Sequence, residues 1–230
     1  MECTLTDCER ILHQLDRLID THSVLHHPFH QAWSVGELRQ EALAIYAWVY
    51  YPHVAAFPNY IERAMKWTRD PEIYHLLEEN LEEELGEPYA HHELWLQFAA
   101  GLGISRHEVL DAEPVPEVEQ AVKIFRRLCD QGSAPALAAL YTYESQQPEL
   151  SASKIQGLRE HYHIHDARTL AYFEVHQEAD QRHREEARWA LQQSIQAGTP
   201  SHVIFEAAQT ALDANWNILD GVCHQAGISC

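Results

Sequence analysis

The chain has 230 residues, of which 46% are hydrophobic and 22% are charged, so it can bury one substantial core. Its formal net charge of −19, with Lys and Arg scattered along the sequence, argues against binding to nucleic acid or to an anionic membrane surface.

Cysteine usage and the N-terminal residues predict a cytoplasmic protein. The five cysteines include no C-x-x-C pair, which indicates neither a disulfide framework nor a thiolate zinc site. The first residues are acidic and lack the apolar core of a secretory signal. The most apolar segment, 42–57, is interrupted by Pro52 and is too short to span a bilayer.

Helical periodicity runs through nearly every segment, and no strand-type alternation persists. A first helix is predicted over 5–19, followed by a short aromatic turn or helix within 24–36. A long apolar helix over 37–67 is expected to break near Pro52 and Pro58, because proline removes an intrahelical hydrogen bond.

The second half of the chain continues the helical pattern. The Asp70-Pro71 pair predicts a helix start, and this helix runs towards Gly101 with interruptions at Gly86 and Pro88. A connection over 103–116 contains one helical turn, and the remaining predicted helices cover 117–130, 133–147, 151–162, 166–197 and 201–222. About seven helices with short connections predict one all-α, bundle-like domain over 1–230.

One helical stripe carries three metal-ligand residue types. His176, Asp180 and His183 lie at i, i+4 and i+7, so they share one side of a helix. Two imidazoles and a carboxylate are a plausible ligand set, whereas the charged segment around them is equally typical of a solvent-facing helix.

Two further segments offer matching ligands. Glu84 and His91 are two helical turns apart, and Pro88 between them predicts a kink that either aims them at one point or separates them. Glu144 lies in the apolar segment A-L-Y-T-Y-E-S-Q, where a buried carboxylate calls for a cation or a proton. The alternative for Glu144 is a solvent-facing position at a helix edge.

Together these residues are three carboxylates and three imidazoles, a set that suits iron or manganese better than zinc. Helical bundles build dinuclear iron and manganese centres from such side chains. The residues alone leave a dinuclear centre and scattered surface charges as two open interpretations.

Several segments resemble one known family over nearly the full chain. They include F-H-Q-A-W-S-V-G-E-L, H-H-E-L-W, L-Y-T-Y-E-S-Q, K-I-Q-G-L and H-Q-E-A-D-Q-R-H, of which the last three are the most specific. The chain is similar to the chlamydial protein associating with death domains and its bacterial relatives. These belong to the haem-oxygenase-like di-iron oxidases and oxygenases, which are related to pyrroloquinoline quinone synthase and thiaminase folds.

The resemblance implies a seven-helix bundle around two metal ions, Fe/Fe or Mn/Fe, held by the six residues of that family's ligand positions. These are Glu84, His91, Glu144, His176, Asp180 and His183. It implies para-aminobenzoate synthesis for folate, in which a tyrosine of the protein becomes the aromatic ring. Dioxygen is the oxidant, an electron donor supplies reducing equivalents, and Lys154 is the implied amino donor.

The chain departs from the family at one position. Where well-known members carry the tyrosine thought to be consumed, this sequence has His30. The tyrosines that remain as candidates are Tyr46, Tyr50, Tyr51, Tyr141, Tyr143 and Tyr172, and each could equally be a core residue.

The His30 departure keeps other functions open. One is a di-iron oxidase acting on a free small molecule such as a fatty acid or an amino acid. A second is a non-enzymatic interaction protein, and a third is a thiaminase-like hydrolase with Cys129 as nucleophile. We expect a homodimer, since dimers are the commonest assembly.

Overall fold

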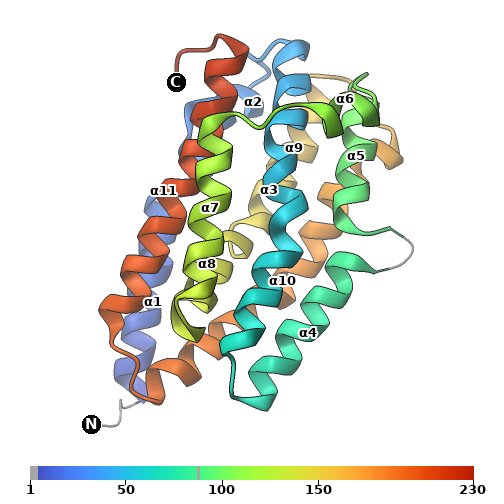
Figure 1. The fold of residues 1–230 in the computed structure, drawn as a ribbon. Coiled ribbons are helices and arrows are strands. Elements are labelled where there is room, and N and C mark those ends of the chain that lie inside the picture. The colour runs from blue at the N-terminus through green and yellow to red at the C-terminus, as the bar shows by residue number, and fades with distance from the viewer. Residues whose placement is uncertain (1–4, 87–88) are drawn as a thin grey trace.

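The computed structural model describes residues 5–86 and 89–230, and this part of the chain contains helices and no strand. The helices in chain order are α1 (Leu5–Thr21), the 3₁₀ helix η1 (Val24–His26), α2 (Pro28–Ser34), α3 (Gln40–Trp67), α4 (Pro71–Leu85), α5 (His91–Gly101), α6 (Arg106–Asp111), α7 (Pro116–Asp130), α8 (Ser133–Glu144), α9 (Gln147–Glu160), α10 (Ala167–Gln196) and α11 (Ser201–Ala226) (Figure 1). The all-α class is confirmed, but the expected number of seven helices is wrong, because short helices such as α2 and α6 connect the long ones.

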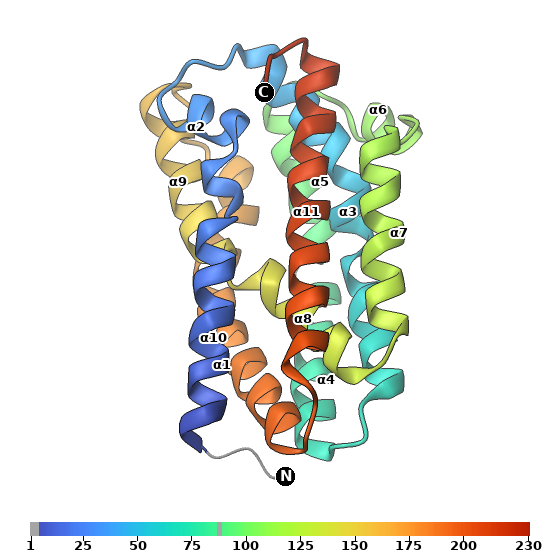
Figure 2. The ribbon, with the colours of Figure 1, turned by 90° about the vertical axis from the view of Figure 1, so that its left-hand side faces the viewer.

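The long helices lie side by side in an upright bundle, and α1, α10 and α11 line the side shown in Figure 2. Helix α8 lies inside the bundle, in contact with α3, α7, α10 and α11. Its sequence is rich in alanine, which lets neighbouring helices approach closely, and every residue from Ala136 to Glu144 is buried. The bundle therefore places Glu144, at the end of α8, in its interior.

The starts of α4 and α6 follow the capping signals of the sequence. Asp70 caps α4 by accepting hydrogen bonds from the backbone N–H groups of Glu72 and Ile73, as the Asp-Pro pair predicts. Ser105 and Glu108 form a reciprocal capping box at α6. No described helix is long and apolar enough to cross a membrane.

The expected breaks at Pro52 and Pro58 are absent, since α3 runs unbroken from Gln40 to Trp67. Each proline removes only one backbone donor from the helix. Tertiary packing outweighs that loss, because α3 contacts α4, α5, α7, α8 and α11 and buries fourteen of its residues.

The segment that carries Glu84 and His91 is two helices rather than one. Helix α4 ends at Leu85, one residue after Glu84, and α5 begins at His91. The predicted kink at Pro88 lies outside the described residues. The spacing of seven therefore spans the connection between two helices and not two turns of one helix.

The sequence predicted no disulfide, and the structure contains one between Cys223 and Cys230. Gly227 ends α11 in the left-handed region, with φ of 63°, a conformation that favours glycine. The chain turns back at this residue, and Cys230 thereby reaches the side chain of Cys223.

Candidate functional site

The six predicted metal ligands come together in the bundle interior as two groups of three. One group is Glu84, His91 and His176, and the other is Glu144, Asp180 and His183. Within each group the donor atoms lie within 4.8 Å of one another, and all six side chains are buried. Helix α10 contributes to both groups, as its i, i+4, i+7 stripe predicts.

In the first group, the Glu84 carboxylate faces two imidazoles. Its Oε1 atom lies 2.9 Å from His91 Nδ1 and 4.0 Å from His176 Nε2. His176 donates a 2.6 Å hydrogen bond from Nδ1 to the carbonyl oxygen of Tyr172, which leaves Nε2 as the atom directed at Glu84. A second hydrogen bond of this kind is how proteins orient a ligating histidine.

In the second group, His183 Nδ1 lies 3.3 Å from Asp180 Oδ1 and 3.9 Å from Glu144 Oε1. Asn80 donates a 2.6 Å hydrogen bond to the same Glu144 oxygen. The opposite ring nitrogen of His183 lies 3.1 Å from the Glu83 carboxylate. From α4, Asn80 thus holds Glu144, and Glu83 holds His183.

The charges of the site are those of a cation-binding centre. Burial raises the pKa of Glu144 to about 8, so this carboxyl retains a proton near neutrality when no cation offsets its charge. Burial lowers the pKa of His183, but its hydrogen bond to Asp180 and nearby carboxylates outweigh burial and raise that pKa to about 9. Asp180 Oδ2 is buried with no hydrogen-bond partner among the described residues. Carboxylate and imidazole donors in this arrangement fit two iron or manganese ions.

Lys154 and Tyr46 meet in the interior beside these groups. Lys154, on α9, donates a 2.7 Å hydrogen bond from Nζ to the Tyr46 hydroxyl and lies 5.2 Å from the centre of that ring. Burial lowers the pKa of Lys154 to about 7, so about half of the amine is uncharged at neutral pH.

The Lys154 amine lines an internal cavity of about 20 Å³, shared with His30, Tyr46, Tyr50 and Tyr143. This volume holds one molecule of about the size of water. Burial lowers the pKa of His30 to about 3, and its Nε2 has no hydrogen-bond partner among the described residues. His30 is therefore neutral and can accept a hydrogen bond from a molecule in the cavity.

Aromatic side chains connect the candidate ligands to this cavity. The Tyr172 ring lies 4.1 Å from that of His176 and 4.7 Å from that of Trp95, and Trp95 lies 5.4 Å from Tyr46 (ring centroids). The Tyr50 and Tyr143 hydroxyls are 3.5 Å apart. The structure thus brings all four of these tyrosines together.

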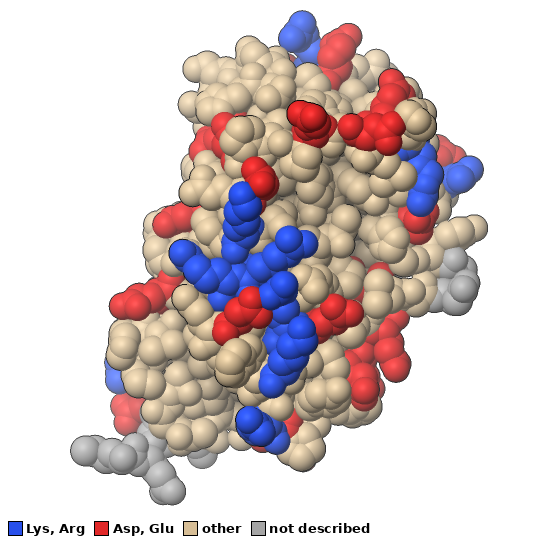
Figure 3. Space-filling view, viewed as in Figure 1, with Lys and Arg blue, Asp and Glu red and all other residues tan. Residues whose placement is uncertain are grey.

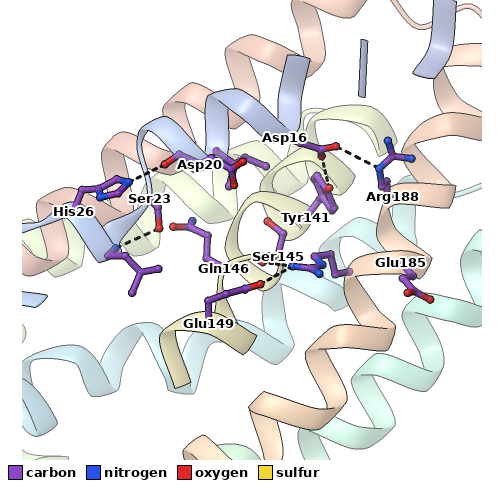
Figure 4. A pocket seen from close by; sticks show the side chains of 13 residues that line it. Asp16, Asp20, Ser23, His26, Tyr141, Ser145, Gln146, Glu149, Glu185 and Arg188 are labelled. Carbon is purple, nitrogen blue, oxygen red and sulfur yellow. Dashed lines mark hydrogen bonds and ion pairs between the residues drawn. The ribbon is translucent and has the colours of Figure 1, made fainter. Parts of the chain in front are cut away.

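Two other candidate tyrosines lie apart from the cavity. Tyr51 is only half-buried on α3. Tyr141 donates a 2.6 Å hydrogen bond to Asp16, which also pairs with Arg188 at a surface pocket between α1, α8, α9 and α10 (Figure 4). This pocket has a volume of about 550 Å³. Gln146 lines both the pocket and the internal cavity, so it forms the wall between them.

The remaining sequence candidate, Cys129, is at the end of α7 and does not line the cavity beside Lys154. Burial raises the pKa of its thiol to about 12, which keeps it in the weakly nucleophilic protonated form. The geometry does not support a cysteine hydrolase.

Sequence reasoning missed Asn80, Glu83 and Gln146. Asn80 lies four residues before Glu84, on the same side of α4, so helical spacing could have found it. Nothing in the sequence distinguishes Glu83 from the neighbouring acidic residues, or Gln146 from other glutamines, because their roles depend on helices distant in the chain.

The chain is similar to known proteins over most of its length. Residues 44–216 match a family model described as an iron-containing redox enzyme. The chain is 42% identical to a 4-aminobenzoate synthase of Chlamydia pneumoniae, over 89% of this chain and 91% of that protein. It is 36% identical to a 4-aminobenzoate synthase of Nitrosomonas europaea, over 91% and 89%.

Solved structures show the same fold at low sequence identity. A haem-oxygenase-like domain of unknown function from Shewanella denitrificans superposes with a TM-score of 0.78 over 98% of both chains, at 18% identity. A CADD-like protein of unknown function from Nostoc punctiforme gives 0.72 over 96% of both chains, also at 18% identity.

Proposed function

The chain belongs to the family of haem-oxygenase-like, iron-containing redox enzymes, and we propose that it makes 4-aminobenzoate from two of its own side chains. Tyr46 supplies the ring in this proposal, and Lys154 supplies the amino group. The relatives in Chlamydia pneumoniae and Nitrosomonas europaea support the product, since both are named 4-aminobenzoate synthases.

The observation that carries the proposal is the 2.7 Å contact between Lys154 Nζ and the Tyr46 hydroxyl. In 4-aminobenzoate the amino group stands para to the carboxyl group, as the phenol oxygen of tyrosine stands para to Cβ. The amine thus lies beside the ring carbon that must exchange oxygen for nitrogen. The phenol oxygen leaves as water when the amine adds, and cleavage of the Cε–Nζ bond then leaves the Lys154 Cε as an aldehyde. Cleavage of the Cα–Cβ bond and oxidation of Cβ, with dioxygen as oxidant, give the carboxyl carbon of the product.

The proposed metal centre consists of the two donor groups. Glu84, His91 and His176 would hold one ion, and Glu144, Asp180 and His183 would hold the other. Bound there as Fe/Fe or Mn/Fe, the ions would supply the redox chemistry that uses dioxygen. Asn80 and Glu83 orient the second group through Glu144 and His183.

The protein environment prepares the two side chains for reaction. Burial keeps much of the Lys154 amine uncharged, and an uncharged amine has the lone pair that a nucleophile needs. The fully buried rings of Tyr172 and Trp95 separate the His176 ring from Tyr46 and exclude water from the space between. His30 cannot supply the ring, and its neutral imidazole instead offers an acceptor to a cavity molecule.

The main alternative, oxidation of a free fatty acid or amino acid, has one feature in its favour, which is His30 at the expected tyrosine position. The size of the internal cavity opposes it, because about 20 Å³ accommodates a molecule such as water or dioxygen but not a fatty acid or an amino acid. The homodimer, the cytoplasmic location and the electron donor stay predictions.

The test uses protein labelled with ring-¹³C tyrosine and ¹⁵N-lysine, loaded with iron and manganese, and exposed to reductant and dioxygen in unlabelled buffer. We expect one 4-aminobenzoate per chain at most, carrying both labels. Peptide mapping should then show loss of the Tyr46 side chain and of the Lys154 nitrogen.

Tyr46→Phe and Lys154→Met should form no product while their metal content is unchanged, whereas Tyr51→Phe should retain activity. Peptide mapping that finds Tyr50, Tyr143 or Tyr172 consumed would move the ring source to that residue. Unlabelled product formed over many turnovers with added substrate would establish the free-substrate oxidase instead.

A further inference from the structure

Basic side chains gather on one face of this acidic protein. They come from the end of α3 and the residues after it, and from α7: Arg63, Lys66, Arg69, Lys123, Arg126 and Arg127. The two helices are packed together, and Arg63 of α3 pairs with Asp130 of α7. Figure 3 shows Lys and Arg concentrated across this face, which we call the α3–α7 basic face. Six of the sixteen Lys and Arg residues thus lie on one face, although these residue types are scattered along the sequence.

Most of this positive charge is available to a partner. Four of these side chains form no ion pair with any carboxylate of the described residues: Lys66, Arg69, Arg126 and Arg127. Lys123, in contrast, pairs with Glu119. Trp67, next to Lys66, leaves 49% of its surface exposed. Arginine and exposed tryptophan are the residue types that protein interfaces favour.

An aromatic cluster lies directly beneath this face. Tyr60 is fully buried and stacks on Phe125 at 5.3 Å. Burial raises the pKa of Tyr60, and the positive charge of Arg126 opposes this rise, which places that guanidinium near the ring. The cluster therefore begins immediately inside the α3–α7 basic face.

Rings in contact continue from this cluster to the candidate metal ligands. Phe57 lies 5.9 Å from Tyr60 and 4.9 Å from Tyr143, whose hydroxyl is 3.5 Å from that of Tyr50. The path is then completed by Tyr50–Trp95 at 5.3 Å, Trp95–Tyr172 at 4.7 Å and Tyr172–His176 at 4.1 Å. A densely packed route thus joins the basic face to His176.

We propose that the α3–α7 basic face docks a small acidic protein that carries one electron, such as an iron–sulfur protein. The inference rests on the proposed function for its need of reducing electrons. Each reduced carrier loses one electron, and one metal ion of the centre gains it, so two carriers reduce both ions. No atom is transferred in this step.

Charge complementarity favours a compact acidic protein over other polyanions. The face combines four unpaired cations with the acidic residues Glu119 and Asp130, and the molecule as a whole carries −19. A long nucleic acid or an anionic membrane would extend beyond the face into that negative field. An acidic carrier can confine its contact to the basic area, where opposite charges speed association.

The first test measures binding without any metal. The probe is an acidic plant-type [2Fe–2S] ferredoxin, titrated into the full metal-free chain by calorimetry at about 0.05 M and about 0.5 M salt. We expect binding that weakens with salt, and an Arg126→Glu/Arg127→Glu variant that binds about tenfold more weakly. Arg126→Gln/Arg127→Gln is a milder version, and Arg10→Glu/Arg17→Glu on α1 makes the same change in net charge elsewhere.

Equal weakening by the α1 control, or no ferredoxin binding at low salt, would overturn the proposal. Binding of a DNA duplex or of phosphatidylserine vesicles to this face, in place of ferredoxin, would also overturn it.

The second test measures oxidation of reduced ferredoxin by the metal-loaded protein, followed by its visible absorbance. The α3–α7 variants should slow this reaction about tenfold, and dithionite should reduce every variant at the same rate. Because binding and ferredoxin oxidation are read without 4-aminobenzoate, failure of the proposed function would leave both results interpretable. Wild-type rates in the α3–α7 variants would refute the docking role.

Discussion

At the scale of single residues, burial shifts the pKa values of side chains in and beside the candidate metal site. Lys154 has the same side chain as any surface lysine, yet burial lowers its pKa to about 7. Glu144 shifts in the opposite direction, to about 8, because burial disfavours a charged carboxylate as it disfavours a charged amine. At neutral pH, burial thereby leaves most of the Glu144 carboxyl and about half of the Lys154 amine uncharged.

The pKa of Lys154 has a consequence for stability. Between pH 7 and about 10 the unfolded chain holds a proton on this amine and the folded chain does not, so folding stability rises with pH. Lys154→Met lacks this dependence. We expect the free energy of unfolding of Lys154→Met, minus that of the wild type, to fall by up to about 1.4 kcal/mol for each pH unit of increase in that range.

Urea unfolding of both proteins at several pH values measures the effect. Lys123→Met, on the exposed surface of α7, serves as the control and should give a difference that does not vary across the range. A constant difference for Lys154→Met would mean that the amine is charged in the folded protein.

At the scale of elements, close approach of helices places the reactive groups. Helix α9 packs against α2, and at Gly157 a Cβ atom would lie 2.7 Å from Trp33 Cδ1. The indole of Trp33 also donates a hydrogen bond to the backbone oxygen of Lys154. Because glycine has no Cβ, α9 can lie this close to Trp33, and its position sets the distance of Lys154 from the aromatic core.

Gly157→Ala should force α9 and α2 apart. We expect a loss of roughly 1 to 3 kcal/mol in the free energy of unfolding, typical of overpacking in a core. Product yield per chain should fall as well, because the Lys154 amine moves from Tyr46. Unfolding curves and product yield measure the two effects.

Ser153→Ala, four residues earlier on the same helix, is the control and should change stability by less than about 0.5 kcal/mol. An unchanged stability for Gly157→Ala would show that Trp33 gives way to the new methyl group.

At the scale of the whole molecule, four helices from distant parts of the chain converge on the two donor groups. Helices α4, α5, α8 and α10 bring three carboxylates and three imidazoles into the interior. Bringing these polar groups together in a core opposes folding unless a cation offsets their charge. Metal binding should therefore stabilise the whole bundle.

We expect manganese(II) at about a hundred times its Kd to stabilise the protein by roughly 2.7 kcal/mol. Binding should also release protons, because Glu144 and His183 retain theirs near neutrality without a cation. Thermal melts measure the first effect, and calorimetry in buffers of different ionisation enthalpy measures the second.

His183→Ala should lose most of the stabilisation, whereas His224→Ala, on an exposed histidine of α11, should retain it. Equal stabilisation of both variants would place the metal outside the two donor groups.

The sequence by itself determined the helical class, because its apolar residues repeat with helical periodicity and its caps mark helix starts. It also placed His176, Asp180 and His183 on one side of a helix, since that stripe requires only local geometry. The breaks predicted at Pro52 and Pro58 were wrong, because packing of α3 outweighs two lost hydrogen bonds. The Cys223–Cys230 disulfide was not predicted, because it depends on a turn at Gly227 that brings Cys230 to Cys223.

Only the tertiary structure decided which groups meet. Tyr46 and Lys154 are 108 residues apart, and nothing local distinguishes Tyr46 from Tyr50 or Tyr172 as the partner of the amine. The α3–α7 basic face likewise combines residues from two helices some sixty positions apart. Such contacts depend on how helices pack, and packing is a property of the whole chain that no local pattern records.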